Sequence, residues 1–545
     1  MLKLKILLLF SVAFGLTFAP TALADRYVVE PGTPGANPES PYDSWATAAT
    51  NIQVAVGAAS AGETIWVSNG TYKATGAGTL FAGVTTMVHL ATNVILRSVN
   101  GPEVTILDGG YPDITNRVIS LNRNAALYGF TVVNGRAGGG GGILIGDYGG
   151  IVSNCVVFSN ISDKALNSGK YTGGGGIFSY ATTGTGYFYN CSVYNNTTIS
   201  NNGGGAYFSE NLIASQCVFS NNATDGYGGG VYLLQGATAL DDCIIINNSS
   251  TNSGAGLFAA SGGAGAIISK CVISGNTGDR GAGCFLNSPV EYCKIIKCNI
   301  SNNQAARWAG GIESQSSKVI LTDCLVANNS AQEYAGGIHY NDSKGNNVAE
   351  IINCVIRDNK VNGTSGGAGA YLRVGSCRMV GCLVVSNVIT STNSGGTGAG
   401  INIQSAGAIC ENNTVVGNIV SNGSGGGIYM SGAGQVINTV IYGNTALTRP
   451  EWYSTGAGSF SNCCTVNTNG MNGSGNIAAD PKFVNAAVGN YHLLASSPCV
   501  NAGINQDWMI AGVDLDGRPR LDRFTKQVDI GCYERLANGV LFMMK

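Results

Sequence analysis

The sequence predicts an all-β protein built around a single-stranded, right-handed parallel β-helix. Two observations lead to this prediction: glycine runs alternate with a regularly spaced asparagine, and each repeat holds about three short β segments between polar bends. Composition agrees, because 81 of the 545 residues are glycine and only 11% are charged, compared with roughly 25% in an average soluble protein. The 44% of hydrophobic residues allow a large core, which argues against a disordered chain.

Residues 1–24 are predicted to be a signal peptide. Lys3 and Lys5 precede an apolar run over residues 6–19, and A-L-A at residues 22–24 fits the small-x-small pattern of a cleavage site. The run is shorter than the ~20 residues that a membrane-spanning helix needs, and no later segment is apolar and long enough. We therefore expect a secreted or cell-surface protein, without a membrane span after cleavage.

Charge limits the class of partner. The formal net charge is −2 for the full chain, and it becomes −4 once the two lysines of the signal peptide are removed. A surface this close to neutral argues against nucleic acid as a partner. We expect a monomer whose partner is a polysaccharide or another cell-surface glycan.

Residues 25–100 are predicted to cap the β-helix and to form its first coil. The stretch SWATAATNIQVAVGAASAGETIWVSNGTY reads as a short amphipathic helix followed by a strand and a turn. Such a segment covers the apolar core and the unpaired strand edge that a first coil would otherwise expose. The stretches VTILDGG and LYGFTVVNG then read as the first coils.

Residues 101–446 are predicted to form about 11 regular coils. In nine copies of the repeat a cysteine stands five residues before an asparagine, and Asn413 and Thr439 replace the cysteine in two more. The cysteines are Cys155, Cys191, Cys217, Cys243, Cys271, Cys298, Cys324, Cys354 and Cys382. The asparagines are Asn160, Asn196, Asn222, Asn248, Asn276, Asn303, Asn329, Asn359, Asn387, Asn418 and Asn444. One copy per coil would stack equivalent residues at about the 4.8 Å spacing of hydrogen-bonded strands.

Each position of the repeat has an expected role. The cysteine and the residue two positions later should point into the core, where a thiol acts as a small apolar group, so most of the 17 cysteines are expected to be free. The asparagine should occupy a bend, because it tolerates a left-handed backbone and can bond to the next coil. The glycine runs allow close backbone approach and lack the Gly-Lys-Ser of a phosphate-binding loop.

These repeats resemble a known family of exported proteins. The pattern [GA]-G-[IV], alternating with V-x-x-x-N over about residues 104–446, is similar to the repeats of polymorphic outer membrane proteins, which belong to the pectate-lyase-like β-helix superfamily. Residues 447–545 break the period, and their stretches DPKF, YHLLASSPCVNAG, DLDGRPR and VDIGCYE resemble the choice-of-anchor Q domain of exported bacterial β-helix proteins. The resemblance implies the fold and says little about activity.

Two candidate features lie in this C-terminal segment. Asp514, Asp516 and Asp529 are candidate ligands for calcium, the one cofactor that the sequence suggests, because a D-x-D-G loop carries the oxygens that calcium prefers. An ordinary turn with surface acids is the alternative. Cys499 and Cys532 are the expected disulfide, because they lie outside the cysteine ladder in one small domain.

A polar patch interrupts an aromatic stripe on the predicted outer face. Strand residues alternate between the two faces of a sheet, so residues two and four positions after each glycine run should face outward. These positions form the patch Glu313, Gln315, His339, Asn341, Tyr371, Arg373, Asn402 and Gln404, flanked by Tyr232, Phe258, Phe285 and Tyr429. Stacked rings beside planar polar groups suit a sugar chain; a solvated face with self-stacking rings is the alternative.

The patch fits binding better than catalysis. Glycoside hydrolases need paired carboxylates, and the patch has one, Glu313. A lyase that uses Arg373 or His339 as its base is possible, but no acid cluster for calcium stands beside them in the sequence. We therefore expect a non-catalytic β-helix protein that binds polysaccharide or another surface. The alternative is a polysaccharide lyase or glycoside hydrolase acting on an acidic polysaccharide through this face.

Overall fold

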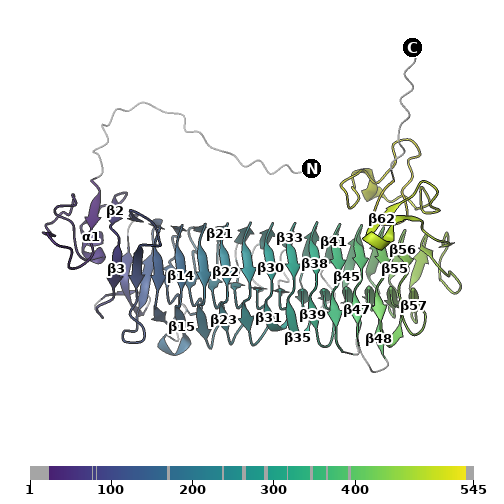
Figure 1. The fold of residues 1–545 in the computed structure, drawn as a ribbon, viewed down its shortest axis with the longest axis horizontal. Helices are drawn as coiled ribbons and strands as arrows, with labels where there is room; N and C mark the ends of the chain where they lie inside the picture. The colour runs from purple at the N-terminus through teal and green to yellow at the C-terminus, as the bar shows by residue number, and fades with distance from the viewer. Residues whose placement is uncertain are drawn as a thin grey trace, which may run out of the picture.

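The chain forms a long parallel β-helix, as predicted (Figure 1). The computed structural model describes residues 24–535, apart from residues 77, 82, 92, 168–171, 236–237, 261–264, 288–291, 316, 344–347, 364–365 and 391–394. The predicted signal peptide therefore lies outside the described residues, except for its last position. Within the described ranges, no helix has the length and apolar character that crossing a membrane requires.

Four sheets run along the axis of the β-helix. Sheet A extends from β1 (Arg26–Val28) to β58 (Ser459–Ser461) and sheet B from β3 (Gly70–Lys73) to β60 (Ile477–Ala478). Sheet D extends from β11 (Arg136–Ala137) to β52 (Ile419–Val420). Sheet C comprises β4 (Thr79–Phe81), β5 (Val84–Leu90), β8 (Arg117–Leu121), β12 (Ile143–Ile145), β16 (Ile177–Ser179), β20 (Ala206–Phe208), β24 (Val231–Leu233), β28 (Leu257–Ala259), β32 (Cys284–Leu286), β36 (Ile312–Gln315), β40 (Ile338–Asn341), β44 (Ala370–Val374), β49 (Ile401–Ile403), β54 (Ile428–Met430) and β57 (Trp452–Ser454).

A single coil shows the path of the chain. It passes through β24 in sheet C, β25 (Thr238–Asp241) in sheet A, β26 (Ile244–Ile246) in sheet B and β27 (Ser249–Ser250) in sheet D. Strand alternation buries Ile245 in the core and leaves Ile244 39% exposed. The next coil repeats this arrangement in register, because Ile245 stands opposite Ile273. The core is therefore a stack of equivalent apolar layers.

The β-helix is longer than the eleven coils that the repeat predicts. Among the described residues, sheets A and B have 16 strands each, whereas sheet D has eleven. The additional coils lie at both ends and include β7 (Thr105–Asp108) and β59 (Cys464–Thr465). They lack the glycine–asparagine repeat, so a search for that repeat does not find them. The β-helix also continues past residue 446, the expected end of the regular coils, to Ala478.

The asparagine ladder is buried and hydrogen-bonded between coils, as predicted. Asn248 is 1% exposed, and its Oδ1 accepts hydrogen bonds from the backbone N–H of Asn222 at 2.9 Å and from Asn222 Nδ2 at 3.0 Å. Its Nδ2 donates to the carbonyl oxygen of Phe219 and to Asn276 Oδ1, both at 3.0 Å. Each amide thus bonds to the coil before it and to the coil after it.

The glycine runs and the asparagines recur together because they touch. A Cβ atom on Gly230, the last glycine of its run, would lie 2.8 Å from Asn248 Nδ2 and 2.7 Å from the carbonyl oxygen of Gly256. The next coil repeats this contact, since a Cβ on Gly256 would lie 2.8 Å from Asn276 Nδ2. Overpacking of this kind forces neighbouring atoms to shift. Glycine therefore keeps open the space that the asparagine amide fills.

A short helix closes the N-terminal end, as predicted. α1 (Ile52–Ala58) begins at Asn51, whose side-chain oxygen accepts a hydrogen bond from the backbone N–H of Val54 at 3.2 Å. Ile52 and Ala55 on its inner face belong to the main core cluster. The helix thus covers apolar side chains that the first coil would expose.

The C-terminal segment folds back onto the side of the last coils (Figure 1). Asn412 Nδ2 donates to the carbonyl oxygen of Asp529 at 3.0 Å, and Asn438 Nδ2 donates to that of Ile504 at 2.8 Å. Asn353 makes a similar bond to the carbonyl oxygen of residue 513. The segment contains β61 (Phe483–Asn485), β62 (Asn490–Leu493) and the 3-10 helix η3 (Asp507–Ile510). It is therefore held by a row of bends between sheets A and B.

Candidate functional site

The outer residues of sheet C stand in one column, as the strand pattern predicts. This outer column consists of Leu144, Phe178, Tyr207, Tyr232, Phe258, Phe285, Glu313, His339, Tyr371, Asn402 and Tyr429, each paired in register with the next. The column brings Glu313, His339, Tyr371 and Asn402 together on four adjacent coils.

Most of the outer column is closed to solvent, which differs from the expected sugar-stacking platform. Phe258 is 6% exposed. Its ring stacks on Tyr232 with 5.2 Å between centroids and on Phe285 with 5.0 Å between centroids. Strand spacing brings the rings into van der Waals contact, so their flat faces are occupied by one another. Strand alternation predicts the face on which a side chain lies but not its exposure.

Glu313 is the centre of a buried polar cluster. Its side chain is 0% exposed, and Oε1 accepts hydrogen bonds from Arg280 Nη2 at 2.9 Å and from Gln315 Nε2 at 3.0 Å. Nδ1 of His339 lies 3.4 Å from Glu313 Oε2. A buried carboxylate requires such partners, because an unpaired buried charge is strongly destabilising. The cluster joins an acid, a guanidinium and an imidazole.

Aromatic rings enclose the imidazole of His339. It stacks on Tyr371 with 5.2 Å between ring centroids and on Tyr334 with 6.4 Å. The indole of Trp308 meets it edge-on at 6.0 Å. Trp308 also lies against the guanidinium of Arg280, 4.3 Å from Cζ to the ring centroid, which is a cation–π contact. The polar cluster therefore has walls of low polarity.

Sequence reasoning missed Arg280, Trp308 and Tyr334, which we call the corner column. They lie where sheet D turns into sheet C, and Trp308 pairs with both of the others. Each stands directly before a glycine-rich run, in R-G-A-G, W-A-G-G and Y-A-G-G. An alignment of the copies on these runs is the signal that would have revealed a second column.

Two alanines beside the cluster adopt a backbone conformation that favours glycine. Ala309 has φ 52° and Ala335 has φ 50°, whereas the equivalent residue of the preceding coil is Gly281. A non-glycine residue in this region costs on the order of 1–3 kcal/mol, and such strain concentrates at functional sites. These positions belong to the coils that carry Glu313 and His339, although other non-glycine residues along the β-helix, such as Lys270 and Ser386, also have positive φ.

Several buried polar atoms of the cluster lack a hydrogen-bond partner among the described residues. They are Oε2 of Glu313, both ring nitrogens of His339, Nε of Arg280 and Oδ1 of Asn402. Most buried polar atoms in proteins are hydrogen-bonded, so exceptions call for a functional explanation. These atoms could donate to or accept from a ligand that enters the cluster.

A β-bulge displaces Arg373 from its expected place. Gln315 pairs with Asn341 as predicted, but Asn341 then pairs with Val374 rather than with Arg373. The bulge inserts one residue and shifts the register after it.

Burial raises the pKa of Tyr371 to about 12, against a smaller opposing effect of the Arg373 charge. The phenol of Tyr371 is therefore protonated at neutral pH.

A groove lies on sheet D, next to the coils that carry the corner column. Its volume is about 610 Å³. It is lined by Thr197, Thr198, Ile199, Ala223, Thr224, Asp225, Ser249, Ser250, Thr251, Thr277, Gly278, Asp279 and Ala306. Seven of these residues carry hydroxyl groups, but Thr198, Thr224 and Ser250 are buried and donate theirs to backbone carbonyls. Two lining residues, Asp225 and Asp279, carry carboxylates. Asp279, at one end of the groove, directly precedes Arg280 in the sequence, whereas the residues of the buried cluster do not line the groove.

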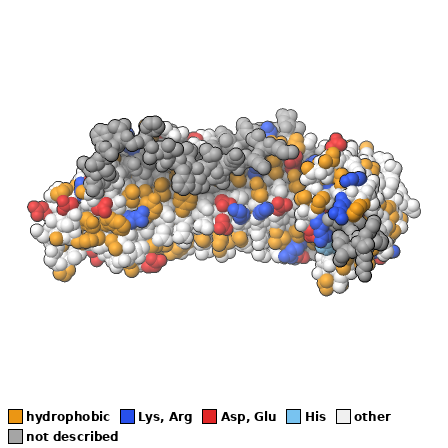
Figure 2. Space-filling view, turned by 90° about the horizontal axis from the view of Figure 1, so that it is seen from above, with side chains coloured by type: hydrophobic (Ala, Val, Ile, Leu, Met, Phe, Trp, Pro, Cys, Tyr) orange, Lys and Arg blue, Asp and Glu red, His pale blue; other side chains and the backbone are white. Residues whose placement is uncertain are grey.

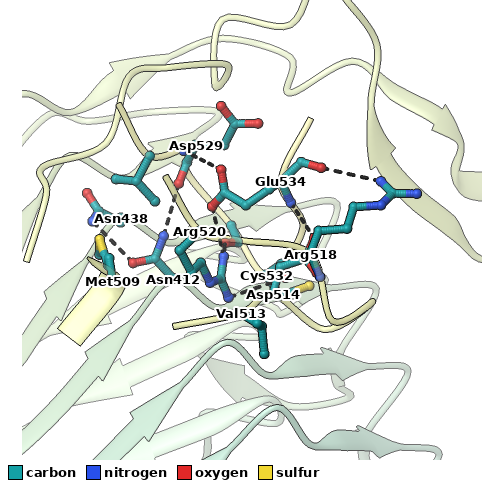
Figure 3. A network of polar contacts seen from close by, with 12 residues as sticks. Asn412, Asn438, Met509, Val513, Asp514, Arg518, Arg520, Asp529, Cys532 and Glu534 are labelled. Carbon is teal, nitrogen blue, oxygen red and sulfur yellow. Dashed lines mark hydrogen bonds and ion pairs between the residues drawn. The ribbon is translucent and has the colours of Figure 1, made fainter. Parts of the chain in front are cut away.

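The C-terminal acids of the described chain do not form the expected calcium site. Asp514 and Asp529 belong instead to a network of polar contacts (Figure 3). Asp514 accepts hydrogen bonds from three backbone N–H groups at 2.7–3.0 Å, and Asp529 accepts from two at 2.6 and 2.7 Å. Asp516 points elsewhere, with Oδ2 lying 2.7 Å from Nε2 of His492. In the part of the chain that the structure describes, no three potential metal ligands gather. The carboxylates fix loop conformation instead.

A buried contact between a guanidinium and a carboxyl group lies beside these loops. Arg520 Nη1 is 3.1 Å from Glu534 Oε1, and Glu534 Oε2 accepts a hydrogen bond from the backbone N–H of Asp529 at 3.0 Å (Figure 3). Burial raises the pKa of Glu534 to about 9 and that of Asp529 to about 6. The C-terminal segment is therefore sensitive to pH.

The structure also corrects the expected disulfide. Cys499 and Cys532 are both buried free thiols, as are all 17 cysteines. Cys499 packs beside Cys464 in one apolar cluster, whereas Cys532 packs against Leu383 in another. Both cysteines do lie outside the ladder, but that position does not make them neighbours.

A family model and several solved structures are similar to this chain. The family described as "Right handed beta helix region" matches residues 214–382. The A-module of mannuronan C-5 epimerase AlgE6 from Azotobacter vinelandii is similar with a TM-score of 0.35 and 13% identity, over 79% of this chain and 95% of that one. Pectate lyase Pel9A is similar with a TM-score of 0.28 and 14% identity, over 94% and 98% of the two chains. The AlgE4 A-module has a TM-score of 0.28 and 14% identity, over 79% and 100%. No curated protein matches the sequence significantly.

Proposed function

We propose that this protein binds polysaccharide on the outside of its right-handed β-helix, in the groove of sheet D and at the adjoining cluster around Glu313. The groove carries the proposal. It is open, it carries the side chains of Thr197, Ser249 and Thr277 on its surface, and it crosses five successive strands of sheet D between Thr197 and Ala306. At the usual strand spacing this is a length of about 20 Å, which suits an extended chain of sugars better than a compact ligand.

The lining of the groove favours neutral sugars. Hydroxyl groups both donate and accept hydrogen bonds, so they can replace the water around a sugar chain. The charged lining residues are Asp225 and Asp279, both acidic, and Asp279 is paired with Arg307. Carboxylates at these places would repel an acidic chain.

The end of the groove would place one sugar at the cluster. We propose that Glu313, His339, Tyr371 and Asn402 contact this sugar, because the unpartnered atoms of Glu313, His339 and Asn402 lie in one column with Tyr371. Gln315, Asn341 and Arg373 border the site, and the stacked rings of Tyr232, Phe258 and Phe285, together with Tyr429, extend the same face. The rings support the face by packing on one another rather than on sugar.

The proposed role also requires export. The predicted signal peptide supports a secreted or cell-surface location. The repeats resemble those of polymorphic outer membrane proteins, and the C-terminal segment resembles a choice-of-anchor Q domain. We propose that both are parts of an exported bacterial protein. Detection of the protein in the culture medium or at the cell surface, with residues 1–24 removed, would support this location. Retention inside the cell would contradict it.

Filling the groove tests the binding proposal. Ser249→Trp places a large side chain on an exposed lining position, and it should abolish binding of neutral oligosaccharides in a glycan array or in calorimetry. Ile244→Trp is the matched control, because Ile244 is also exposed but lies on sheet B, outside the groove. Equal affinity of both variants for every glycan that the wild type binds would rule out the groove.

A polysaccharide lyase is the second candidate function. It is favoured by the unpartnered buried atoms of Glu313 and His339 beside the strained Ala309. In this case His339 would take a proton, Glu313 would orient the imidazole, and Tyr371, which keeps its proton, would donate to the leaving oxygen. Absorbance from newly formed double bonds would detect the reaction, and His339→Ala should abolish it. Binding without any such absorbance would favour the non-catalytic function.

A further inference from the structure

A strip of aromatic residues lies on the outer face of sheet A near the N-terminal end. Trp66, Arg97, Tyr128, Ser153 and Tyr189 stand in register on five successive coils, and we call them the sheet A strip. They come from β2 (Thr64–Val67), β6 (Ile95–Ser98), β9 (Ala125–Tyr128), β13 (Gly150–Ser153) and β17 (Gly186–Tyr189). Hydrophobic side chains gather on the visible face toward this end of the molecule in Figure 2.

The sheet A strip differs from the outer column of sheet C in its spacing. Aromatic residues occupy every second coil, and Arg97 and Ser153 separate them. Tyr128 and Tyr189 are two strand spacings apart, roughly 9–10 Å, so they do not stack on each other. Tyr189 is 38% exposed. Ser153, on the coil between the two tyrosines, has a small, half-buried side chain, and the ring of Tyr189 stacks on that of Tyr187 with 6.0 Å between centroids.

Arg97 has its charge available for a ligand. Its guanidinium carbon lies 4.4 Å from the ring centroid of Tyr128 and 5.7 Å from that of Trp66. Among the described residues, it forms no ion pair and donates no hydrogen bond. The nearby carboxylate of Asp25 accepts a hydrogen bond from Trp66 Nε1 at 2.9 Å. Ring contacts thus hold the guanidinium in place, while its N–H groups stay free to bind a carboxylate in bidentate fashion.

We infer that the sheet A strip binds a carboxylate-bearing polysaccharide laid along the axis of the β-helix. A uronate carboxylate pairs with Arg97, and a sugar ring of the same chain lies over Ser153 between Tyr128 and Tyr189, where its C–H groups meet aromatic surface. An extended β-linked chain advances by about one strand spacing per sugar, so polar and aromatic contacts alternate in step with it. The inference rests on the proposed function in one respect, that the ligand is a glycan. In other respects the two proposals are independent, because the strip and the groove lie on different sheets and carry opposite charge.

Calorimetric titration of the full chain tests this inference. The probes are a β-1,4-linked oligoglucuronate and its carboxyl-reduced counterpart, a cello-oligosaccharide of equal length. Arg97→Gln should weaken oligoglucuronate binding about tenfold or more, since hydrogen bonds to charged groups are among the stronger ones, and should change cello-oligosaccharide binding less than about twofold. Tyr189→Ala should also weaken oligoglucuronate binding, because it removes an aromatic ring from the strip, and it should leave cello-oligosaccharide binding in the groove unchanged.

Tyr194→Ala is the matched control. Tyr194 lies on β18 (Ser192–Tyr194) of the same coil, half-buried on the outer face of sheet B, and its ring stacks on Phe158 at 5.1 Å. This variant should bind both probes like the wild type, and unchanged melting temperatures would show that all variants are folded.

Three results would overturn the inference. The wild type could bind oligoglucuronate no more tightly than its carboxyl-reduced counterpart, or Arg97→Gln could bind oligoglucuronate as tightly as the wild type does. The third such result is that the wild type binds a sulfated glucan more tightly than oligoglucuronate. Ser249→Trp separates the two proposals. Loss of cello-oligosaccharide binding in Ser249→Trp, with no oligoglucuronate binding by any variant, would leave the groove supported and refute only the strip. Absence of all glycan binding would refute both.

Discussion

Replacing Asn248 with alanine removes four side-chain hydrogen bonds from the middle of the asparagine ladder. Two are accepted from the backbone N–H and Nδ2 of Asn222, and two are donated to Phe219 and Asn276. Asn222 Nδ2 still donates to the carbonyl oxygen of Val193, and Asn276 Oδ1 still accepts a hydrogen bond from the backbone N–H of residue 248. The backbone N–H of Asn222 is therefore left without its acceptor in a site that excludes water.

The expected loss of stability follows from these bonds. A buried polar group without a partner costs about 1–3 kcal/mol, and an ordinary buried hydrogen bond contributes about 1 kcal/mol net. We therefore expect Asn248→Ala to lower the free energy of unfolding by about 2–4 kcal/mol. Guanidinium unfolding followed by circular dichroism measures this change, and an unchanged slope would confirm that the native state stays compact. Hydrogen exchange at Asn222 should become faster, because its N–H loses the Asn248 acceptor.

Ser249→Ala is the matched control for this prediction. Ser249 is the next residue and is exposed, so its loss should change stability by no more than about 0.5 kcal/mol. A loss below about 0.3 kcal/mol in Asn248→Ala, with unchanged exchange at Asn222, would refute the view that the ladder holds the coils together.

Four further predictions concern other parts of the chain. Ala309→Gly should raise stability by about 1 kcal/mol, since it relieves a positive φ; an unchanged or lower melting temperature would contradict the strain. The pKa of Asp529 is raised to about 6, so the folded state retains a proton that the unfolded chain releases near pH 4. Stability contributed by this group is therefore complete below about pH 4 and lost as pH rises to about 6, and Asp529→Asn should remove that component from a pH series of thermal melts. Cys499 and Cys532 should both be alkylated in denatured, unreduced protein. A disulfide-linked peptide that contains both cysteines would contradict this prediction. Mass spectrometry of exported protein should find Asp25 at the N-terminus, whereas a retained leader would defeat the signal-peptide assignment.

The repeat made the fold predictable because its signal is local and periodic. Asn248 and Gly230 recur at nearly fixed spacing, and only stacked coils place every copy in an equivalent environment. The outer column of sheet C was predictable for the same reason, since strand alternation places Glu313 and His339 on one face. The coils without the repeat, such as the one that contains β59, gave no such signal.

The parts that could not be predicted depend on contacts that sequence position does not encode. Whether Glu313 is exposed depends on what packs over it, and Arg280 reaches it from a corner that the strand pattern does not describe. The bulge that displaces Arg373 changes the register by a single residue. The predicted disulfide between Cys499 and Cys532 was wrong for a related reason. The two cysteines lie in different parts of the C-terminal segment, and each packs in a different apolar cluster against the coils.

The returning C-terminal segment has a mechanical consequence. A plain stack of repeats can peel from its end one coil at a time, because each coil touches only its neighbours. Here side chains of Asn353, Asn412, Asn438 and Asn462, spread over five consecutive coils, are all bonded to residues 502–529. The last coil cannot leave until this strap is released, so the five coils should open together as one cooperative unit. Under load, the protein should begin to unravel at its helix-capped end, and the strapped end should give way last.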